Sequence, residues 1–265
     1  MHEGPPDGIP LRLPSLDELG DALGAAATVL RANAAAAGLE APVPTCPGWT
    51  VRDLVAHQGM VHRWAASHLR GHPDDDPDAT ERAGLASADL LGWFDDGATD
   101  LLQAVVDAPD DLDALVFLHD APAPRLFWAR RQCHETTIHA VDALGARLGR
   151  APRADETWIR PAIALDGIDE LLTGFVPRRK QGVSREPLRL LVAPMSTTRA
   201  WLLDIAPDRP PVVERLEIDA GRAVPAHDAL VTGEPVEVQL RLWSRGGEPR
   251  DEIERWWTDT VSVTW

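Results

Sequence analysis

Cysteine is scarce in this 265-residue chain: Cys46 and Cys133 are the only two, too few for a disulfide framework. Free thiols are typical of a reducing compartment, so we expect a cytoplasmic protein. The chain has no run of about 18 apolar residues, so no membrane span is expected. The stretch Met1 to Pro14 lacks a basic start followed by an apolar stretch, and is not interpreted as a signal peptide.

Lysine is almost absent as well, since Lys180 is the only one. With 26 basic against 42 acidic residues, the formal net charge is −16. Such an acidic surface repels phosphate backbones, so nucleic acid is not expected as a partner. The sequence also contains no P-loop, no Gly-rich dinucleotide fingerprint and no Gly-x-Ser-x-Gly nucleophile elbow. These absences direct attention to other polar residues.

Four helices of similar length are predicted in the first 150 residues. Ser15 with Glu18, and Thr50 with Asp53, have the spacing of capping boxes, which mark helix starts. Apolar spacing and stop signals give the remaining limits. The predicted helices cover residues 15–38, 51–69, 85–106 and 124–148, with a solvated loop over residues 71–80. Together they predict a four-helix bundle.

The pattern changes after the short Pro-containing segment Gly149 to Asp155, which we take as a domain boundary. The predicted domains are therefore residues 1–150, a metal-binding helical bundle, and residues 151–265, an α/β domain. In the second domain we expect helices over 156–176 and 253–258, and strands over 188–193, 200–205, 212–218 and 261–265. Residues 236–243 are ambiguous between strand and helix.

His57 is the first residue that suggests chemistry. It belongs to the helical row Leu54, His57, Val61 and Trp64, which is otherwise apolar and should face the interior of the bundle. A histidine there is either hydrogen-bonded in the core or a metal ligand, and the row alone favours the core.

Glu135 and His139 are four residues apart on the fourth predicted helix, so their side chains share one face. Taken alone, the pair indicates only a solvated polar face. Combined with an inward His57, the pair forms a set of two histidines and one carboxylate with open positions. Catalytic zinc sites use this set together with a water molecule, and non-haem iron uses the same ligand types. The spacing does not decide between these metals.

Two blocks of the sequence resemble a known family. Residues 46–57, CPGWTVRDLVAH, and residues 130–143, RRQCHETTIHAVDA, resemble the second-helix and fourth-helix signatures of the mycothiol-dependent maleylpyruvate isomerase family. Both occur in the expected order and at plausible spacing. Weaker likeness continues through DGIDELL at residues 166–172 and a segment ending LRLWSR at residues 240–245.

The resemblance implies a DinB-like four-helix bundle followed by a sterol-carrier-like α/β domain. It also implies a divalent metal, zinc in the family, with its ligands at His57, Glu135 and His139. Mycothiol is implied as thiol co-substrate. Arg245 is the best match to the C-terminal arginine needed near the family's site, although residues 246–250, GGEPR, depart from the family pattern.

The resulting expectation is an enzyme in which a metal-bound mycothiol thiolate adds to an electrophilic small molecule, giving isomerisation or S-transfer. Gln132 and Asp142 are candidates for orienting the histidines, and Arg63, Arg131 and Arg245 for binding an anionic substrate. Two alternatives remain open: a non-catalytic small-molecule binding protein of the same fold, or a pathway-specific enzyme with another co-substrate. The chain is expected to act as a monomer or homodimer.

Overall fold

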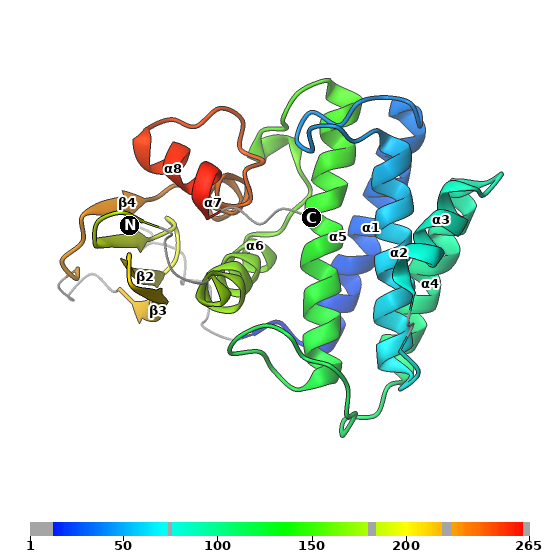
Figure 1. The fold of residues 1–265 in the computed structure, drawn as a ribbon, viewed down its shortest axis with the longest axis horizontal. Helices are drawn as coiled ribbons and strands as arrows, with labels where there is room; N and C mark the ends of the chain where they lie inside the picture. Colours follow the sequence, from blue (N-terminus) through cyan, green and yellow to red (C-terminus); the bar gives the residue numbers. More distant parts are fainter. Residues whose placement is uncertain (1–12, 74–75, 180–183, 219–223, 262–265) are drawn as a thin grey trace, which may run out of the picture. The chain divides into compact units, whose positions relative to one another are not determined.

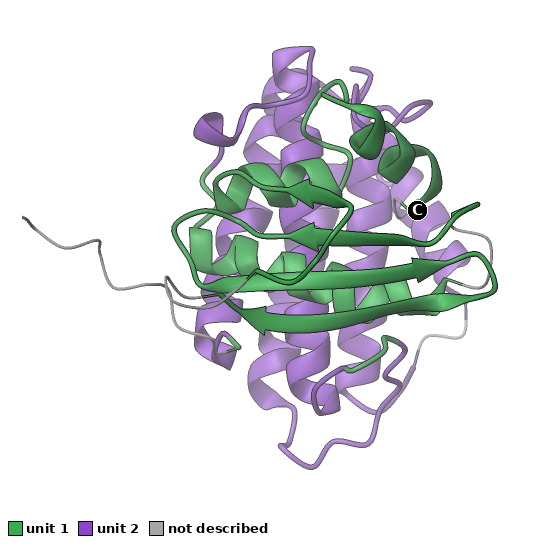
Figure 2. Cartoon of the chain, turned by 90° about the vertical axis from the view of Figure 1, so that its left-hand side faces the viewer, with its two compact units in different colours: residues 1–13, 118–120, 158–265 green, residues 14–117, 121–157 purple. Residues whose placement is uncertain are grey.

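A computed structural model describes residues 13–73, 76–179, 184–218 and 224–261 (Figure 1). The chain divides into two compact units, coloured separately in Figure 2. The helical unit comprises residues 14–117 and 121–157. The C-terminal unit comprises residues 118–120 and the described residues from 158 onwards, with Leu13.

The helical unit contains four long helices, whose starts follow from local sequence. The first, α1 (Leu16–Ala37), and the second, α2 (Val51–Leu69), both begin with the predicted capping boxes, at Ser15 and Thr50. The others are α4 (Leu90–Asp107) and α5 (Pro124–Leu148), and α5 ends at Gly149 in a left-handed conformation (φ 69°) that glycine adopts without strain. Three of the four predicted helices therefore agree within one residue at each end. The third begins five residues later than predicted.

These four helices pack on one another, with α1 against α5 and α4, and α2 against α4 and α5. Their contact faces are lined by fully buried side chains such as Leu30, Leu54, Phe94 and Ile138. Helix α5 is unusual because its central turns, from Phe127 to Gly145, are buried on every side, including the polar residues. Buried polar groups need partners, and those of α5 build the site described below.

A short helix, α3 (Pro77–Leu85), overlaps the end of the segment predicted as a loop. The loop prediction was wrong there because Asp76 caps the helix, accepting a hydrogen bond from the Ala79 backbone N–H, and Pro77 occupies its first turn. The Trp93 ring of α4 lies against Gly59 of α2 and Gly84 of α3, where a Cβ would come within 2.3 and 2.7 Å of it. The two glycines thus admit the ring and bring α3 beside α2.

The C-terminal unit contains a four-stranded mixed sheet in the order β3-β2-β1-β4 (Figure 2). β1 (Leu188–Val192), β2 (Arg199–Ala206) and β3 (Arg209–Glu217) form an antiparallel meander. The three strands were predicted from their apolar runs, but their pairing was not. β4 (Ala229–Val231) was not predicted, and pairs parallel to β1. Three residues are too short for a strand pattern to be recognised.

Helices complete the C-terminal unit. The predicted helix 156–176 is split into α6 (Pro161–Asp169) and a π-helical segment (Glu170–Phe175), followed by a 3₁₀ turn (Val176–Arg178). Its first residue belongs to another 3₁₀ turn (Ala154–Glu156), which lies in the helical unit. The ambiguous segment is a helix, α7 (Pro235–Leu242), which packs on α6. The last helix is α8 (Glu252–Thr260). The predicted closing strand lies outside the described residues, apart from Val261, which ends α8.

One short segment of the α4–α5 connection belongs to the C-terminal unit. Asp169, largely buried, accepts hydrogen bonds from Trp201 Nε1 (2.9 Å) and from Arg215 Nε and Nη2 (2.5 and 2.8 Å). The same Arg215 pairs with Asp120, and the backbone N–H of His119 donates to the Gly174 carbonyl (3.3 Å). Residues 118–120 are thereby anchored to the π-helical segment and to β3.

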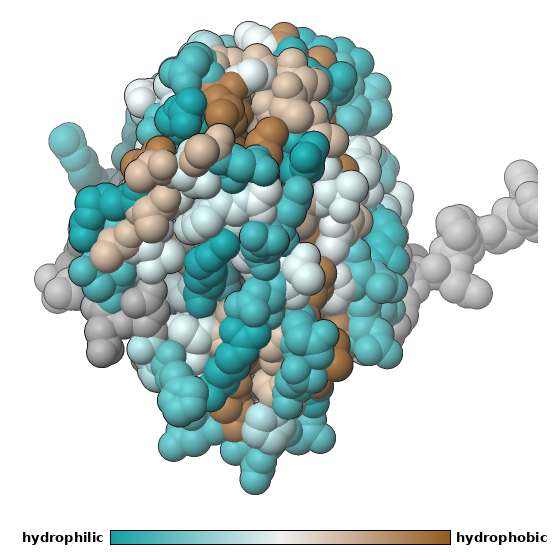
Figure 3. Space-filling view, turned by 90° about the vertical axis from the view of Figure 1, so that its right-hand side faces the viewer, coloured by the Kyte–Doolittle hydropathy of each residue, from teal (hydrophilic) through white to brown (hydrophobic). Residues whose placement is uncertain are grey.

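The surface of the side that carries α3 and α4 consists mainly of hydrophilic and intermediate residues, with strongly hydrophobic ones in small groups (Figure 3). Such scattered apolar residues are normal for a protein surface. Among the described residues, none of the helices combines the length and apolar character needed to cross a membrane.

Candidate metal centre

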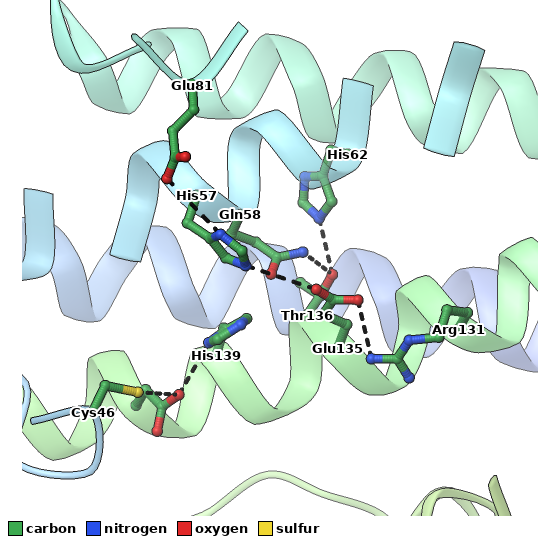
Figure 4. Close-up of polar contacts among 10 residues, drawn as sticks. Cys46, His57, Gln58, His62, Glu81, Arg131, Glu135, Thr136 and His139 are labelled. Carbon is green, nitrogen blue, oxygen red and sulfur yellow. Dashed lines mark hydrogen bonds and ion pairs between the residues drawn. The ribbon is translucent and has the colours of Figure 1, made fainter. Parts of the chain in front are cut away.

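Helices α2 and α5 bring together the three residues singled out from the sequence. His57 lies on α2, whereas Glu135 and His139 lie one turn apart on α5 and face α2 (Figure 4). One ligand atom from each lies within 4.8 Å of the others. The Nε2 atom of His57 is 3.8 Å from Oε1 of Glu135, and the two imidazole centroids are 5.3 Å apart. The structure therefore brings His57 close to Glu135 and His139, which local sequence patterns alone could not establish.

Glu135 is buried, and its charge is balanced by Arg131, one turn earlier on α5. Arg131 Nη2 donates to Oε2 of Glu135 at 3.0 Å, and only 1% of the arginine side chain is exposed. Burial by itself raises the pKa of Glu135, but the charge of Arg131 and the nearby histidines outweigh it and lower the pKa to about 2. The carboxylate is therefore ionised at neutral pH, with Oε2 held by Arg131 and Oε1 directed toward His57.

Each imidazole presents its Nδ1 atom to a carboxylate on its outer side. Nδ1 of His139 lies 3.0 Å from Oδ2 of Asp142, and both side chains are fully buried. Nδ1 of His57 lies 3.9 Å from Oε1 of Glu81, a residue of α3. The Glu81 side chain is about a third exposed. Burial lowers the pKa of His139, so its imidazole is neutral near pH 7. Neutral imidazole is the form that binds metals.

Trp49 covers the two imidazoles from the loop that precedes α2. Its ring is stacked on His139 with centroids 6.1 Å apart, and tilted against His57 at 5.0 Å. The loop is closed by a bridge between Pro42 and Thr50, at the N-cap of α2. The resemblance included this tryptophan in its first block, but the sequence alone gave no reason to place it against the ligands.

A second polar group lies beside the candidate centre. Gln58 Nε2 donates to Thr136 Oγ1 at 3.0 Å, and His62 Nε2 lies 2.9 Å from the same hydroxyl (Figure 4). All three residues are fully buried between α2 and α5. Burial is the main cause that lowers the pKa of His62 to about 3, with Arg63 contributing and Glu135 opposing. His62 is therefore a neutral core histidine.

The remaining predicted residues have varied surroundings. His68 stacks on Trp128 with centroids 4.7 Å apart, and His134 is fully buried, so both are packing residues as expected. Arg63 lies over the Trp93 ring at 3.7 Å and donates to two backbone carbonyls, which gives it a structural role.

Arg245 follows α7 in the C-terminal unit. It is 5% exposed, and its Nη1 donates to the Trp243 carbonyl at 2.8 Å.

Several site residues were not identified from the sequence. Glu81 was missed because no helix was predicted between the loop at residues 71–80 and the helix at residues 85–106. Thr45 and Cys46 contact Asp142 across 97 and 96 positions of sequence, a distance that no local pattern spans. Arg131 was considered only as a binder of substrate anions, whereas it pairs with Glu135. Its spacing of four residues from Glu135 on a helix was the available signal.

The donor set fits a divalent metal ion. Two imidazoles and one ionised carboxylate, all on rigid helices, are ligands of catalytic zinc and of non-haem iron. The hydrogen bond from His139 Nδ1 to Asp142 leaves Nε2 as the ligand atom, and outer carboxylates of this kind accompany metal-binding histidines. No fourth protein donor is needed, because catalytic sites retain an open position.

Comparison with known proteins agrees with this geometry. Residues 19–144 match the family model described as "Mycothiol maleylpyruvate isomerase N-terminal domain". This segment holds all three candidate ligands and most of the helical unit. Residues 19–144 are therefore similar to the N-terminal domain of the mycothiol maleylpyruvate isomerase family, in agreement with the two sequence blocks.

Solved structures extend the likeness of fold beyond that segment. The chain resembles a crystal structure of the mycothiol-dependent maleylpyruvate isomerase, with a TM-score of 0.56 and 16% sequence identity. A histidine-to-alanine mutant of that enzyme gives a TM-score of 0.58 at the same identity. Each match covers 88% of this chain and 90% of the other. At this identity the likeness concerns the fold. No curated protein sequence matches the chain.

Proposed function

We propose that the protein is a metal-dependent enzyme that uses mycothiol, with a divalent metal held by His57, Glu135 and His139. Zinc is proposed because of the resemblance to the family. The convergence of these three donors within 4.8 Å, in a segment that matches the family model, is the observation that carries the proposal. When bound, the metal would supply a Lewis acid that favours the thiolate form of the thiol.

The charges of the site support an anionic thiol ligand. The donor set contributes a single negative charge, from Glu135, and Arg131 beside it contributes a compensating positive charge. Both imidazoles are uncharged as ligands. Asp142, behind His139, adds a second buried carboxylate. Together these groups would leave one positive charge of a divalent ion unbalanced in a buried environment, where an anion is favoured. A thiolate is an anion of the required kind.

The reaction we propose begins with addition of the thiolate sulfur to an unsaturated carbon conjugated to a carbonyl, whose oxygen receives the electron pair. If rotation about the former double bond is followed by expulsion of the thiolate, the outcome is cis–trans isomerisation. If the new carbon–sulfur bond persists and the carbon is protonated, the outcome is S-transfer. Arg245 is proposed to bind the acidic electrophile, since a guanidinium matches carboxylate geometry.

We also propose a fold type for each of the two domains. We propose that the helical domain, residues 1–150, is a DinB-like four-helix bundle, and that residues 151–265 form a sterol-carrier-like domain. The packing of α1, α2, α4 and α5 and the mixed sheet support these assignments. A monomer or homodimer in the cytoplasm remains our prediction.

Metal analysis of the purified protein tests the ligand set. The wild type should bind one equivalent of Zn²⁺ and gain thermal stability, by about 2.7 kcal/mol at a free concentration 100 times the Kd. His57→Ala should lose both. His72→Ala is the matched control, because His72 is an exposed histidine of the same unit. Equal zinc binding by wild type and His57→Ala would refute the ligand set.

An activity assay separates the enzyme from a binding protein. Purified zinc-loaded protein is incubated with mycothiol and an unsaturated keto acid, and isomer and thioether are both quantified. Turnover that requires mycothiol and disappears with a chelator supports the proposal. Tight binding of the acid that persists in chelator, without turnover, would replace it with the non-catalytic alternative.

A further inference from the structure

Asp142, on α5, is a buried carboxylate that receives hydrogen bonds from three donors. Thr45 Oγ1 lies 2.6 Å from Oδ1, Cys46 Sγ 3.3 Å from Oδ2, and His139 Nδ1 3.0 Å from Oδ2. Asp142 has no exposed surface. We call Thr45, Cys46, His139 and Asp142 the Asp142 cluster; Cys46 and His139 are labelled in Figure 4.

Hydrogen-bond chemistry determines which groups of the cluster donate and which accept. An ionised carboxylate only accepts hydrogen bonds, whereas a hydroxyl and a thiol can donate. The nitrogen that faces Asp142 must therefore be the protonated one, so His139 has its hydrogen on Nδ1. The other nitrogen, Nε2, then keeps its lone pair for a ligand. Because Thr45 and Cys46 hold the carboxylate, they also determine where it holds the imidazole.

Thr45 and Cys46 belong to a tight loop, not to the helix that carries Asp142. Within the loop, the backbone N–H of Cys46 donates to the Val43 carbonyl (3.0 Å), and the N–H of Trp49 donates to the Cys46 carbonyl (3.0 Å). The N–H of Val43 in turn donates to the Trp49 carbonyl (2.9 Å). One compact turn thus fixes both donors to Asp142 and the Trp49 ring that stacks on His139.

We infer that Thr45 and Cys46 are positioning residues, which act through Asp142 to hold His139 in the tautomer and orientation that direct Nε2 toward His57 and Glu135. The inference rests on the proposed function for its consequence, metal binding. Its structural part, the tautomer of His139, does not depend on any metal.

The same atoms invite a different interpretation. Cys46, His139 and Asp142 also have ligand atoms within 4.8 Å of one another, close enough to hold a metal ion themselves. The distances favour hydrogen bonding, since 3.0 Å from nitrogen to oxygen is ordinary for a charge-assisted hydrogen bond. A metal there would also displace the proton that joins His139 to Asp142. Direct ligation by Cys46 is therefore treated as an outcome that would contradict the inference.

The other histidine provides an internal control. His57 also faces a carboxylate through Nδ1, but Glu81 is 3.9 Å away and partly exposed. That distance is too long for a hydrogen bond. Glu81→Gln should therefore change little, whereas Asp142→Asn removes the acceptor that fixes His139. The two substitutions are chemically equivalent and differ only in the geometry under test.

The first experiment reads the tautomer of His139 in metal-free protein by long-range ¹H–¹⁵N correlation NMR of the imidazoles. We expect the Nδ1–H form in wild type and in Glu81→Gln. In Asp142→Asn we expect a shift toward the Nε2–H form, because the amide can donate to Nδ1. An Nε2–H tautomer in wild type, or no change in Asp142→Asn, would overturn the inference whether or not the protein binds metal.

The second experiment measures Co²⁺ affinity and the visible spectrum of the Co²⁺-loaded protein. Asp142→Asn should weaken binding about 10–100-fold, as is typical for loss of such an outer carboxylate. Thr45→Val and Cys46→Ala should weaken binding less and alter the spectrum, whereas Thr45→Ser and Cys46→Ser, which keep a donor, should restore both. Wild-type affinity and spectra in Thr45→Val and Cys46→Ala would refute the positioning role.

Two further outcomes separate this inference from the proposed function. A cobalt–thiolate band that Cys46→Ser abolishes would show Cys46 to be a ligand and would overturn the positioning role. If wild type binds no Co²⁺ while the NMR result is as expected, the metal proposal fails and the hydrogen-bonded cluster stands. Circular dichroism of every variant confirms that losses do not come from unfolding.

Discussion

Replacing His62 should change how the stability of the protein depends on pH. In the folded chain the pKa of His62 is about 3, against 6.5 for an ordinary histidine. Below pH 6.5 the unfolded chain therefore takes up a proton that the folded chain rejects, and stability falls as the pH falls. The loss continues until the pH approaches 3, where the folded state is protonated as well.

The size of this effect follows from the two pKa values. Each pH unit below 6.5 costs about 1.4 kcal/mol per proton, so one such histidine lowers the free energy of unfolding by about 2 kcal/mol between pH 8 and pH 5. That window lies above the ordinary pKa of carboxyl groups. His62→Gln keeps a polar group near Thr136 but cannot titrate, so it should lack this part of the pH dependence.

The assay is urea unfolding of chelator-treated protein at pH 8, 6.5 and 5, followed by far-ultraviolet circular dichroism. Titrations of other groups contribute equally to wild type and His62→Gln, so they cancel in the difference between the two free energies of unfolding. That difference should become smaller by about 2 kcal/mol from pH 8 to pH 5. His72→Gln, which alters an exposed histidine, is the control and should behave as wild type. If wild type and His62→Gln lose stability in parallel, His62 does not resist protonation and the reasoning is wrong.

Three further substitutions test the packing around the site. Gly59→Ala should destabilise the protein by about 1–3 kcal/mol in thermal unfolding, since its Cβ would meet the Trp93 ring at 2.3 Å; addition of Trp93→Leu should recover part of the loss, and no recovery would exclude this clash as the cause. Arg131→Met should cost the metal-free protein about 3–5 kcal/mol, because the Glu135 carboxylate is left buried and unbalanced, and Zn²⁺ should restore part of this; a neutral effect in chelator would contradict the pairing. Arg215→Met should cost about 1–3 kcal/mol by removing charge-assisted hydrogen bonds to Asp169; unchanged thermal unfolding would show that Asp169 does not depend on Arg215 for its stabilisation.

The long helices were predictable because their signals are local. Capping boxes at Ser15 and Thr50 and the stop at Gly149 depend on residues three or four positions apart. The π-helical segment at Glu170–Phe175 was not predictable in this way, since its residues continue an ordinary helical pattern. A change of hydrogen-bond register of this kind depends on tertiary packing, which a local pattern does not contain.

The candidate centre shows the same division. His57 was predicted to face inward from an apolar row, and Glu135 and His139 to share one helix face from their spacing. The three residues formed a possible ligand set, but only the family resemblance favoured a metal site over the alternatives. What holds them in place could not be predicted: Asp142 accepts from residues nearly a hundred positions away. Glu81 lies near His57 on α3, a helix that was not predicted from the local sequence. The candidate ligands could be found in sequence motifs, whereas the residues that hold them in place are brought together only by the tertiary fold.

The anchoring of residues 118–120 has a consequence for dissecting the protein. Because that segment belongs to the C-terminal unit while its neighbours on both sides belong to the helical unit, the polypeptide passes between units at four points: 13/14, 117/118, 120/121 and 157/158. Expressing residues 14–157 alone would therefore separate Asp120 from Arg215. A fragment that starts at residue 158 would lack residues 118–120, which belong to its own unit. A truncation at one linker would create two incomplete fragments, and domain exchange with a relative would have to transplant the loop together with the sheet.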